Sequence, residues 1–128
     1  MLELKDLYFS VGDRNIIDGI NYTFERGKFY GITGPNGSGK TTLAKLIMGI
    51  NAANSGSILL AGKEISQLSI TERAKEGIAY SFQQPARFKG ITFRDLLAMA
   101  AGTEDEEMLL ALLRRVGICS LSFLDKPV

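Results

Sequence analysis

One glycine-rich run stands out in the chain, Gly34-Pro35-Asn36-Gly37-Ser38-Gly39-Lys40-Thr41. It fits the pattern G-x-x-x-x-G-K-S/T at every fixed position. Glycines let consecutive backbone N–H groups turn inward, and the resulting concave loop favours anions. An apolar run at 28–33 predicts a strand before the loop, and the apolar spacing at 42–48 predicts a helix after it. The positive N-terminal dipole of that helix, near Lys40, completes the pattern of a phosphate-binding loop.

The residues at the end of the loop indicate which phosphate compound it binds. Lys40 is expected to reach the β- and γ-phosphates of a nucleoside triphosphate as a catalytic residue, and the Thr41 hydroxyl is expected to help hold Mg²⁺. The alternative is a glycine-rich surface loop with one exposed lysine, which the flanking strand and helix disfavour. The predicted nucleotide-binding residues of this run are Gly34, Pro35, Asn36, Gly37, Ser38, Gly39, Lys40, Thr41 and Thr42.

The segment before the loop predicts an antiparallel β meander. Residues 2–11 alternate between apolar and polar in two stretches offset at Asp6, which is typical of a strand with a bulge or a change of face. Two more short strands are expected at 15–17 and 20–24, joined by Asp18-Gly19 as a hairpin turn.

The segment after the loop predicts mixed strands and helices. Strands are expected at 57–60 and 78–82. Helices with the spacing of a capping box are expected at 70–76 behind Ser69 and Glu72, at 92–101 behind Thr92 and Asp95, and up to about Val116 behind Thr103 and Glu106. The last helix has an apolar face that predicts core packing, formed by Met108, Leu109, Leu112, Leu113 and Val116. This order of elements predicts an α/β architecture with an antiparallel part attached.

The composition excludes several classes of chemistry. The 128 residues carry 15 basic and 14 acidic side chains, and this balance gives no electrostatic reason to expect nucleic acid as a partner. The absence of histidine removes histidine bases and nearly all histidine-containing metal sites. The one cysteine, Cys119, excludes an intrachain disulfide and is expected to be a small buried apolar residue. No apolar run reaches the roughly 18–20 residues that span a bilayer, and the alternating start of the sequence lacks the hydrophobic stretch of a signal peptide, so we expect a cytoplasmic protein.

The loop and its flanks resemble the nucleotide-binding domain of the ABC ATPases over the whole chain. Besides the loop, the resemblance lies in Leu7-Tyr8-Phe9-Ser10, in 17–24, in 27–30, in Met48-Gly49 and in Ser55-Gly56-Ser57-Ile58. It implies an α/β fold in which a P-loop NTPase core and an N-terminal antiparallel β subdomain (1–91) precede the start of an α-helical subdomain (92–128). The implied ligands are ATP and Mg²⁺. The implied partners are a second ATPase subunit in a head-to-tail dimer and a transmembrane permease, which would bring the protein to the membrane periphery.

The same resemblance assigns two further residues to the site. Gln83, after the predicted strand 78–82, resembles the family's Q-loop glutamine, which would approach the metal and the attacking water. A neutral amide suits this role because it can accept from water and donate to phosphate without adding charge. The alternative for Gln83 is a polar residue at a strand end. Many members of the family have an aromatic residue that stacks on adenine at the position of Val11. Valine has no ring, so Val11 is expected to make only apolar contact with the adenine.

Four segments narrow the resemblance to the ATPase of the Suf iron–sulfur cluster assembly system. They are Leu7-x-x-Ser10-Val11, Glu72-Arg73-Ala74, Glu76-Gly77-Ile78 and Phe82-Gln83-x-Pro85. The ATPase of that system is soluble and binds assembly partners in place of a permease. The resemblance therefore implies Suf-like scaffold proteins as partners, and a generic importer ATPase is the alternative.

Three parts of the family's catalytic machinery are absent from the 128 residues. There is no Leu-Ser-Gly-Gly signature, no apolar strand that ends in Asp-Glu, and no histidine for the family's switch position. We therefore expect the first half of an ABC ATPase, an incomplete domain that associates with itself because the strand 28–33 is left as an exposed edge. We expect this half to bind nucleotide weakly and to hydrolyse it negligibly.

Other classes of function stay as alternatives. A small kinase would need an arginine-rich lid and a GTPase an Asn-Lys-x-Asp guanine reader, and the sequence has neither pattern. A fragment without enzymatic activity could bind nucleotide, or could bind a partner through the apolar face at 108–116. Core packing explains that face more simply.

Overall fold

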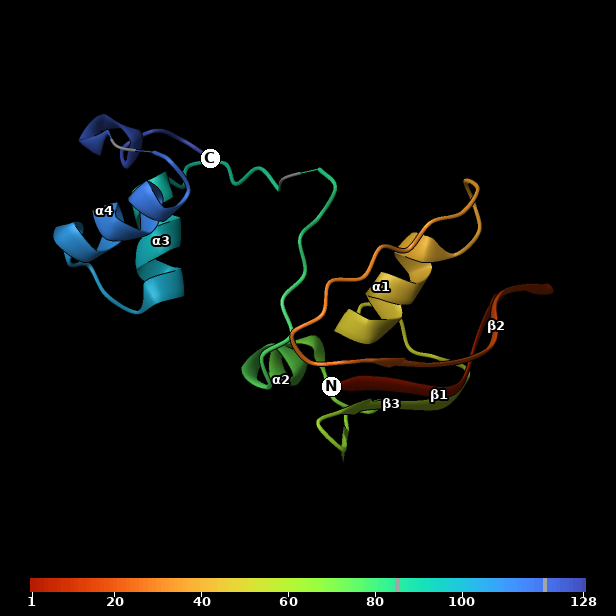
Figure 1. The fold of residues 1–128 in the computed structure, drawn as a ribbon. Helices are drawn as coiled ribbons and strands as arrows, with labels where there is room; N and C mark the ends of the chain where they lie inside the picture. Colours follow the sequence, from red (N-terminus) through yellow and green to blue (C-terminus); the bar gives the residue numbers. More distant parts are fainter. Residues whose placement is uncertain (85, 119) are drawn as a thin grey trace. The chain divides into compact units, whose positions relative to one another are not determined.

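The computed structural model describes residues 1–84, 86–118 and 120–128. In these ranges the chain forms two compact units, residues 1–81 and residues 82–128, and each is described by itself (Figure 1). Two expectations from the sequence fall on residues outside the described ranges: the burial of Cys119 and the Pro85 position of the Suf-like pattern.

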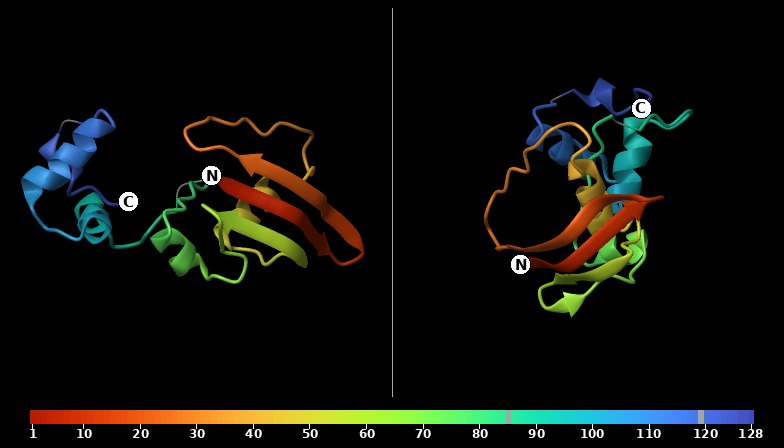
Figure 2. Two further views of the ribbon diagram at one scale, coloured as in Figure 1. Left: turned by 60° about the horizontal axis from the view of Figure 1, so that its bottom comes forward. Right: turned by 90° about the vertical axis from the view of Figure 1, so that its right-hand side faces the viewer.

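The first unit is built on a four-stranded antiparallel sheet with the strand order β2-β1-β3-β4. Its strands are β1 (Leu2–Val11), β2 (Arg14–Phe24), β3 (Ser55–Leu60) and β4 (Lys63–Glu64). β1 lies between β2 and β3, and the three long strands run side by side in Figure 2. The predicted strand at 2–11 is confirmed, and the one predicted at 57–60 begins two residues earlier.

A bulge in β1 decides which of its side chains reach the core. The pairing with β2 shifts between Leu4 and Leu7, where β1 carries an extra residue and Asp6 has φ 45°. Because of that residue Leu4 and Leu7 are both buried, although strict alternation would place them on opposite faces. Asn21 of β2 stabilises the bulge: its Oδ1 accepts the Asp6 N–H at 2.9 Å, and its Nδ2 donates to Asp6 Oδ1 at 2.7 Å. The predicted offset at Asp6 is thus confirmed as a bulge.

The hairpin turn predicted at Asp18-Gly19 is wrong, because β2 runs through these residues without a break. Leu7 pairs with Ile20 and Phe9 with Ile17, so β2 has one residue more than β1 between the two pairs. Asp18-Gly19 therefore forms a second bulge, which restores the register that the first bulge shifts. An Asp-Gly pair is typical of hairpin turns and of β-bulges, and only the strand with which its neighbours pair distinguishes a turn from a bulge.

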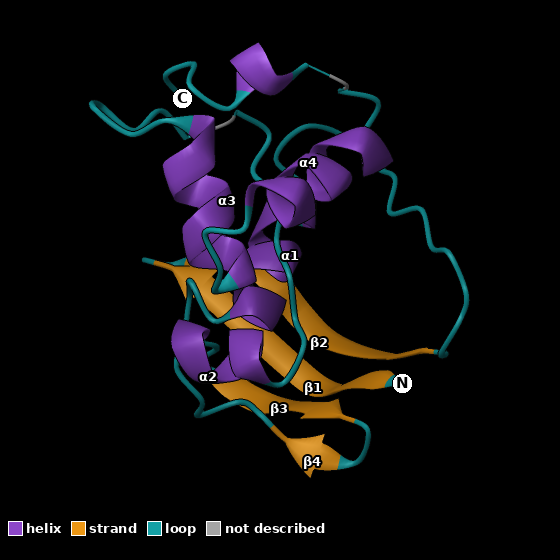
Figure 3. Ribbon diagram, turned by 90° about the vertical axis from the view of Figure 1, so that its left-hand side faces the viewer, coloured by secondary structure: helices purple, strands orange, loops and turns teal. Residues whose placement is uncertain are grey.

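Two helices belong to the first unit, α1 (Lys40–Met48) and α2 (Ile70–Lys75). α1 lies over one face of the sheet and packs Leu43 and Leu46 against it (Figure 3). The capping box predicted for α2 is confirmed, because the Ser69 hydroxyl accepts the Glu72 N–H and the Glu72 carboxylate accepts the Ser69 N–H. The buried residues of this core are Leu4, Leu7, Ile17, Leu43, Leu46, Ile58 and Ile65.

The strands predicted at 28–33 and 78–82 are not formed. A strand needs a neighbouring strand, and the strand pairings formed by the described residues include neither run. Apolar side chains of the first run are nevertheless open to solvent: Phe29 is 99% exposed and Ile32 is half-exposed.

The second unit consists of α3 (Phe93–Ala101), α4 (Glu106–Arg115) and the short 3-10 helix η1 (Leu121–Phe123). The capping box predicted for α3, between Thr92 and Asp95, is confirmed. The predicted cap at Thr103 is wrong: α4 is capped by Asp105, whose carboxylate accepts the Glu107 N–H at 3.0 Å. Among the described residues of this unit, the buried apolar core consists of Leu109, Leu113 and Leu124.

The apolar face predicted for α4 packs only in part. Leu109 and Leu113 are buried and Leu112 is half-buried, as a core face requires. Met108 is 52% exposed and Val116 72% exposed, so for these two the prediction of core packing is wrong. The core of this small unit covers only the part of the α4 apolar face around Leu109 and Leu113. The edges of that face therefore stay in contact with solvent.

Candidate functional site

The glycine-rich loop ends at Gly39, the residue that caps α1. Gly39 is buried and has φ 91°, in the left-handed region that favours glycine. A Cβ at this position would lie 2.9 Å from the backbone oxygen of Ile16 in β2. Glycine is therefore required for two reasons at once, and the start of α1 lies directly against β2.

The first turn of α1 leaves its N–H donors open. The first four N–H groups of a helix have no acceptor within the helix, and here Leu43 is the first to bond back, to Gly39 O at 2.8 Å. No side chain caps Gly39, and no acidic residue lies in the first turn. The N–H groups of residues 39–42 and the positive end of the helix dipole are therefore available to an anion at the loop.

Lys40 places its charge within the loop. Its ammonium donates to Gly34 O at 2.8 Å, to Pro35 O at 2.7 Å and to Ser38 Oγ at 3.4 Å. The Ser38 N–H donates to Pro35 O at 3.2 Å and closes a turn in the same segment. The structure thus brings together the loop, the start of α1 and the lysine, as the sequence predicts. This combination of backbone donors and an ammonium fits the triphosphate of ATP.

The remaining loop positions fit a Mg²⁺ ion that is held jointly by the protein and by the phosphates of the nucleotide. Asn36, Gly37 and Thr41 are exposed, and Thr42 is half-buried. No group of three His, Cys, Asp or Glu residues that could hold a metal ion occurs within the described ranges. Mg²⁺ is commonly held by one or two protein oxygens together with phosphate oxygens and water. The exposed hydroxyl of Thr41 suits that arrangement as the protein oxygen.

Two predicted site residues lie outside the loop. Val11 ends β1 and is 62% exposed, so its side chain is free to make apolar contact. Gln83 belongs to the second unit and lies at an exposed bend. The parts that these two residues play in the site stay predictions.

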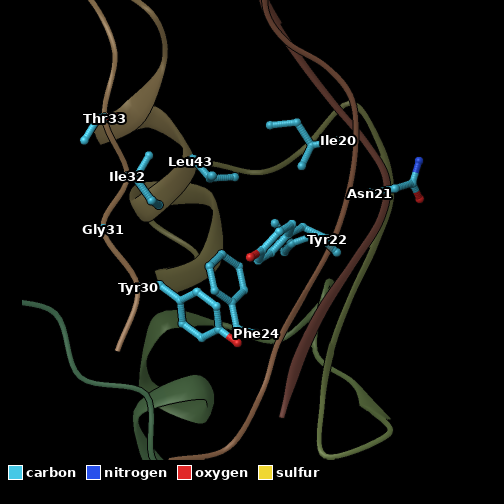
Figure 4. Close-up of a pocket in the computed structure, with 10 residues that line it drawn as sticks. Ile20, Asn21, Tyr22, Phe24, Tyr30, Gly31, Ile32, Thr33 and Leu43 are labelled. Carbon is cyan, nitrogen blue, oxygen red and sulfur yellow. The ribbon is translucent and has the colours of Figure 1, made fainter. Parts of the chain in front are cut away.

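A cavity of about 410 Å³ lies beside the segment that leads into the loop (Figure 4). Three aromatic rings form a contact cluster on its wall: the ring centroids of Tyr22 and Phe24 are 4.8 Å apart, and those of Phe24 and Tyr30 are 5.1 Å apart. The Tyr30 hydroxyl accepts the Glu25 N–H at 2.8 Å. The lining includes Thr33 and Leu43, the residues on either side of the run 34–42, and no residue of the run itself. It is lined by Leu4, Ile20, Asn21, Tyr22, Phe24, Tyr30, Gly31, Ile32, Thr33 and Leu43.

Known proteins resemble this chain in sequence and in fold. The profile of the family described as "ABC transporter" matches residues 17–128. A probable ATP-dependent transporter of Pyropia yezoensis is 45% identical over 102 residues, which are 78% of this chain and 41% of that protein. An uncharacterised ABC transporter ATP-binding protein of Methanocaldococcus jannaschii is 36% identical over the full chain and 55% of its own length.

The fold comparison agrees. A solved ATP-binding cassette, described as dimeric, in a post-hydrolysis state and bound to ADP and Pi, superposes with a TM-score of 0.80 at 21% identity. The superposition covers 99% of this chain and 61% of that structure. The chain thus spans about half the length of the curated relatives it matches. It belongs to the ABC transporter family, as part of an ATP-binding domain.

Proposed function

We propose that this chain binds Mg²⁺–ATP through residues 34–42, as the nucleotide-binding part of an ATPase that changes the conformation of partner subunits. The observation that carries the proposal is the start of α1. There the open N–H donors, the buried Gly39 and the ammonium of Lys40 meet at one loop. Anions bind where such donors and charges converge.

Each site residue has a part in this proposal. The N–H groups of residues 39–42 and the Lys40 ammonium hold the β- and γ-phosphates. The Thr41 hydroxyl supplies an oxygen to Mg²⁺, whose charge offsets that of the phosphates. Gln83 orients water near the γ-phosphate and contacts the metal, and Val11 makes apolar contact with the adenine.

A titration of the 128-residue chain with Mg²⁺–ATP tests the proposal, with Lys40→Ala and Lys45→Ala measured beside it. Lys45 is the matched control, because it lies in the last turn of the same helix, away from the loop. We expect Lys40→Ala to weaken binding about 100-fold, the effect of one or two lost hydrogen bonds between charged groups. Lys45→Ala should bind like the parent chain. Equal affinity of all three chains, or no binding by the parent, would contradict the proposal.

We further propose that the chain alone turns ATP over negligibly. Hydrolysis needs a positioned water and stabilisation of charge in the transition state. The 128 residues supply Lys40, Thr41 and Gln83 but have no histidine and no apolar run that ends in Asp-Glu. Phosphate release in excess of background, and abolished by Lys40→Ala, would show that this part of the proposal is wrong.

For the whole protein we propose a cytoplasmic ATPase that pairs with a second ATPase subunit and serves Suf-like iron–sulfur cluster assembly. The segments Leu7-x-x-Ser10-Val11 and Glu72-Arg73-Ala74 support Suf-like scaffold proteins as partners over a permease. No helix within the described ranges has the length and apolar character that crossing a membrane requires. Affinity capture with purified Suf scaffold proteins and with a permease, side by side, distinguishes the two partners; capture by the permease alone would refute the Suf-like role.

A further inference from the structure

Helix α2 carries a buried cation, Arg73, which is 2% exposed. Its guanidinium donates to four backbone oxygens at 2.7–3.1 Å, namely those of Leu46, Ile47, Ser66 and Leu68. Burial lowers the pKa of Arg73, but a guanidinium stays charged in proteins. A buried charge is tolerated only where hydrogen bonds replace its hydration, so the arrangement of these four oxygens is what keeps Arg73 inside.

Two of the four oxygens belong to the last turn of α1. The final carbonyls of a helix have no partner within the helix, and they form the negative end of its dipole. Arg73 Nη1 donates to Leu46 O at 2.7 Å and to Ile47 O at 2.8 Å, so the guanidinium closes this end of α1. Gly49 ends the helix with φ 83°, and a Cβ there would lie 2.9 Å from Arg73 Nε. The guanidinium therefore occupies the space that any other residue at position 49 would need.

One of the other two oxygens, Ser66 O, connects Arg73 to the sheet. Arg73 Nη2 donates to Ser66 O at 2.7 Å, and the Ser66 hydroxyl accepts the Ile58 N–H of β3 at 2.8 Å. The C-terminal end of α1 is thus linked to β3 through Arg73 and Ser66.

The two ends of α1 are therefore fixed to two different strands. Gly39 lies against Ile16 of β2, and Arg73 connects the far end to β3. α1 has nine residues, so at about 1.5 Å per residue its ends are roughly 13 Å apart. A helix of this length transmits a shift or rotation at one end to the other, and its first residues are Lys40 and Thr41.

We propose that Arg73 is a positioning residue for the phosphate loop. It touches no part of the predicted nucleotide site, and it acts by holding α1 so that the first-turn N–H groups and Lys40 keep the orientation that phosphate needs. This inference rests on the proposed binding of Mg²⁺–ATP, and it adds a residue that the loop pattern does not contain.

Two variants at this position and two controls test the proposal. Arg73→Met removes the charge and all four hydrogen bonds, and Arg73→Lys keeps the charge with fewer donors. Lys75→Met removes an exposed charge from the same helix, and Ile58→Val weakens the core of the same unit. Each chain is titrated with Mg²⁺–ATP at a temperature where circular dichroism shows it folded. Amide hydrogen exchange of Leu43, whose N–H donates to Gly39 O and closes the first turn, is measured without nucleotide.

We expect Arg73→Met to bind Mg²⁺–ATP about tenfold more weakly and Arg73→Lys to recover part of that loss. Exchange of the Leu43 N–H should become faster in Arg73→Met, with little change in β1. Lys75→Met should bind Mg²⁺–ATP with the affinity of the parent chain. Ile58→Val should lower the melting temperature, and any loss of its apparent affinity should be no larger than the fraction of unfolded chain explains.

Two results would overturn the proposal. The first is parental affinity in Arg73→Met, and the second is unchanged exchange of the Leu43 N–H. If Arg73→Met does not fold, the same two measurements on Arg73→Lys decide. If the parent chain fails to bind Mg²⁺–ATP, the proposed function is wrong, and the exchange experiment still shows on its own whether Arg73 positions the start of α1.

Discussion

Helices α1 and α3 have the same length of nine residues and begin in opposite ways. At α3 the Thr92 hydroxyl accepts the Asp95 N–H, and the Asp95 carboxylate accepts the Thr92 N–H. At α1 the capping position is Gly39, which has no side chain to offer, and no carboxylate lies in the first turn. One helix start is satisfied by its own residues, whereas the other is left open for an external anion.

The comparison shows where the stability of the open helix comes from. An uncapped N-terminus lacks a contribution of about 1 kcal/mol that a capping side chain provides. α1 is stabilised elsewhere, by the burial of Leu43 and Leu46 and by Arg73 at its far end. A helix that serves a ligand at one end is held by packing along its side and by a partner at the other end.

We expect the largest effect on stability and on Mg²⁺–ATP affinity from Gly39→Ala, at the open start of α1. Alanine is strained at φ 91°, and its Cβ would meet Ile16 O at 2.9 Å. We expect the free energy of unfolding of the first unit to fall by about 2–3 kcal/mol, together with a large loss of Mg²⁺–ATP affinity. Urea denaturation and a nucleotide titration measure the two effects. Gly12→Ala is the control, since Gly12 also has a positive φ, 57°, but a Cβ there would have nothing within 4 Å. An equal loss of stability and affinity in Gly12→Ala would mean that contact with β2 is not what fixes α1.

A smaller effect is expected when the open helix start is given a carboxylate. Thr42→Glu places one at the position that Asp95 occupies in α3, and Thr42→Gln is the neutral control of the same shape. We expect Thr42→Glu to bind Mg²⁺–ATP about tenfold more weakly than Thr42→Gln at low salt, because the carboxylate repels phosphate. The difference should shrink as salt is added. Identical affinities at low salt would argue against phosphate binding at this turn.

The smallest effect is expected at the closed helix start. Thr92→Ala removes the hydroxyl of the α3 capping box and should lower the stability of the second unit by about 1 kcal/mol. Thr103→Ala is the control, because Thr103 is not the capping residue of a helix and its hydroxyl accepts the Asp105 N–H. Mg²⁺–ATP affinity should be the same in both chains, and thermal unfolding followed by circular dichroism measures the difference in stability.

The same capping box should also show in the response to acid. Hydrogen bonds from the Thr92 hydroxyl and then from its N–H lower the pKa of Asp95. A carboxylate whose pKa is lowered by folding stabilises the fold above the usual pKa of Asp, and this contribution disappears as the pH falls through the lowered value. The stability difference between the parent and Thr92→Ala should therefore be larger at neutral pH than in strong acid, where the hydroxyl keeps only its bond from the Asp95 N–H. A difference of the same size at both pH values would contradict the role of the carboxylate.

The sequence predicts well those features whose partners are close along the chain. The loop at 34–41 and the boxes Ser69/Glu72 and Thr92/Asp95 depend on residues within a few positions of one another, and the helices and boxes form as expected. The strand predicted at 28–33 fails because a strand depends on a neighbour that its own sequence does not specify.

The missed features depend on partners far along the chain. Asp18-Gly19 has the composition of a turn, and only its pairing with β1 makes it a bulge. Arg73 lies in a polar stretch with no sign of burial, because two of its acceptors lie 26 and 27 residues away and are backbone oxygens of any residue type. The position of Arg73 in the last turn of a short helix does not indicate that its acceptors lie at the end of α1.

The aromatic cluster beside the loop has a consequence for spectroscopy. The chain contains no tryptophan and four tyrosines, so its intrinsic fluorescence is that of tyrosine. Two of the four, Tyr22 and Tyr30, lie in the cluster, with ring centroids 6.0 Å apart. Tyr30 stands four residues before Gly34, so a change in the segment that leads into the loop alters the surroundings of a fluorophore the chain already contains. The protein thus carries an optical reporter next to its phosphate loop and needs no attached label.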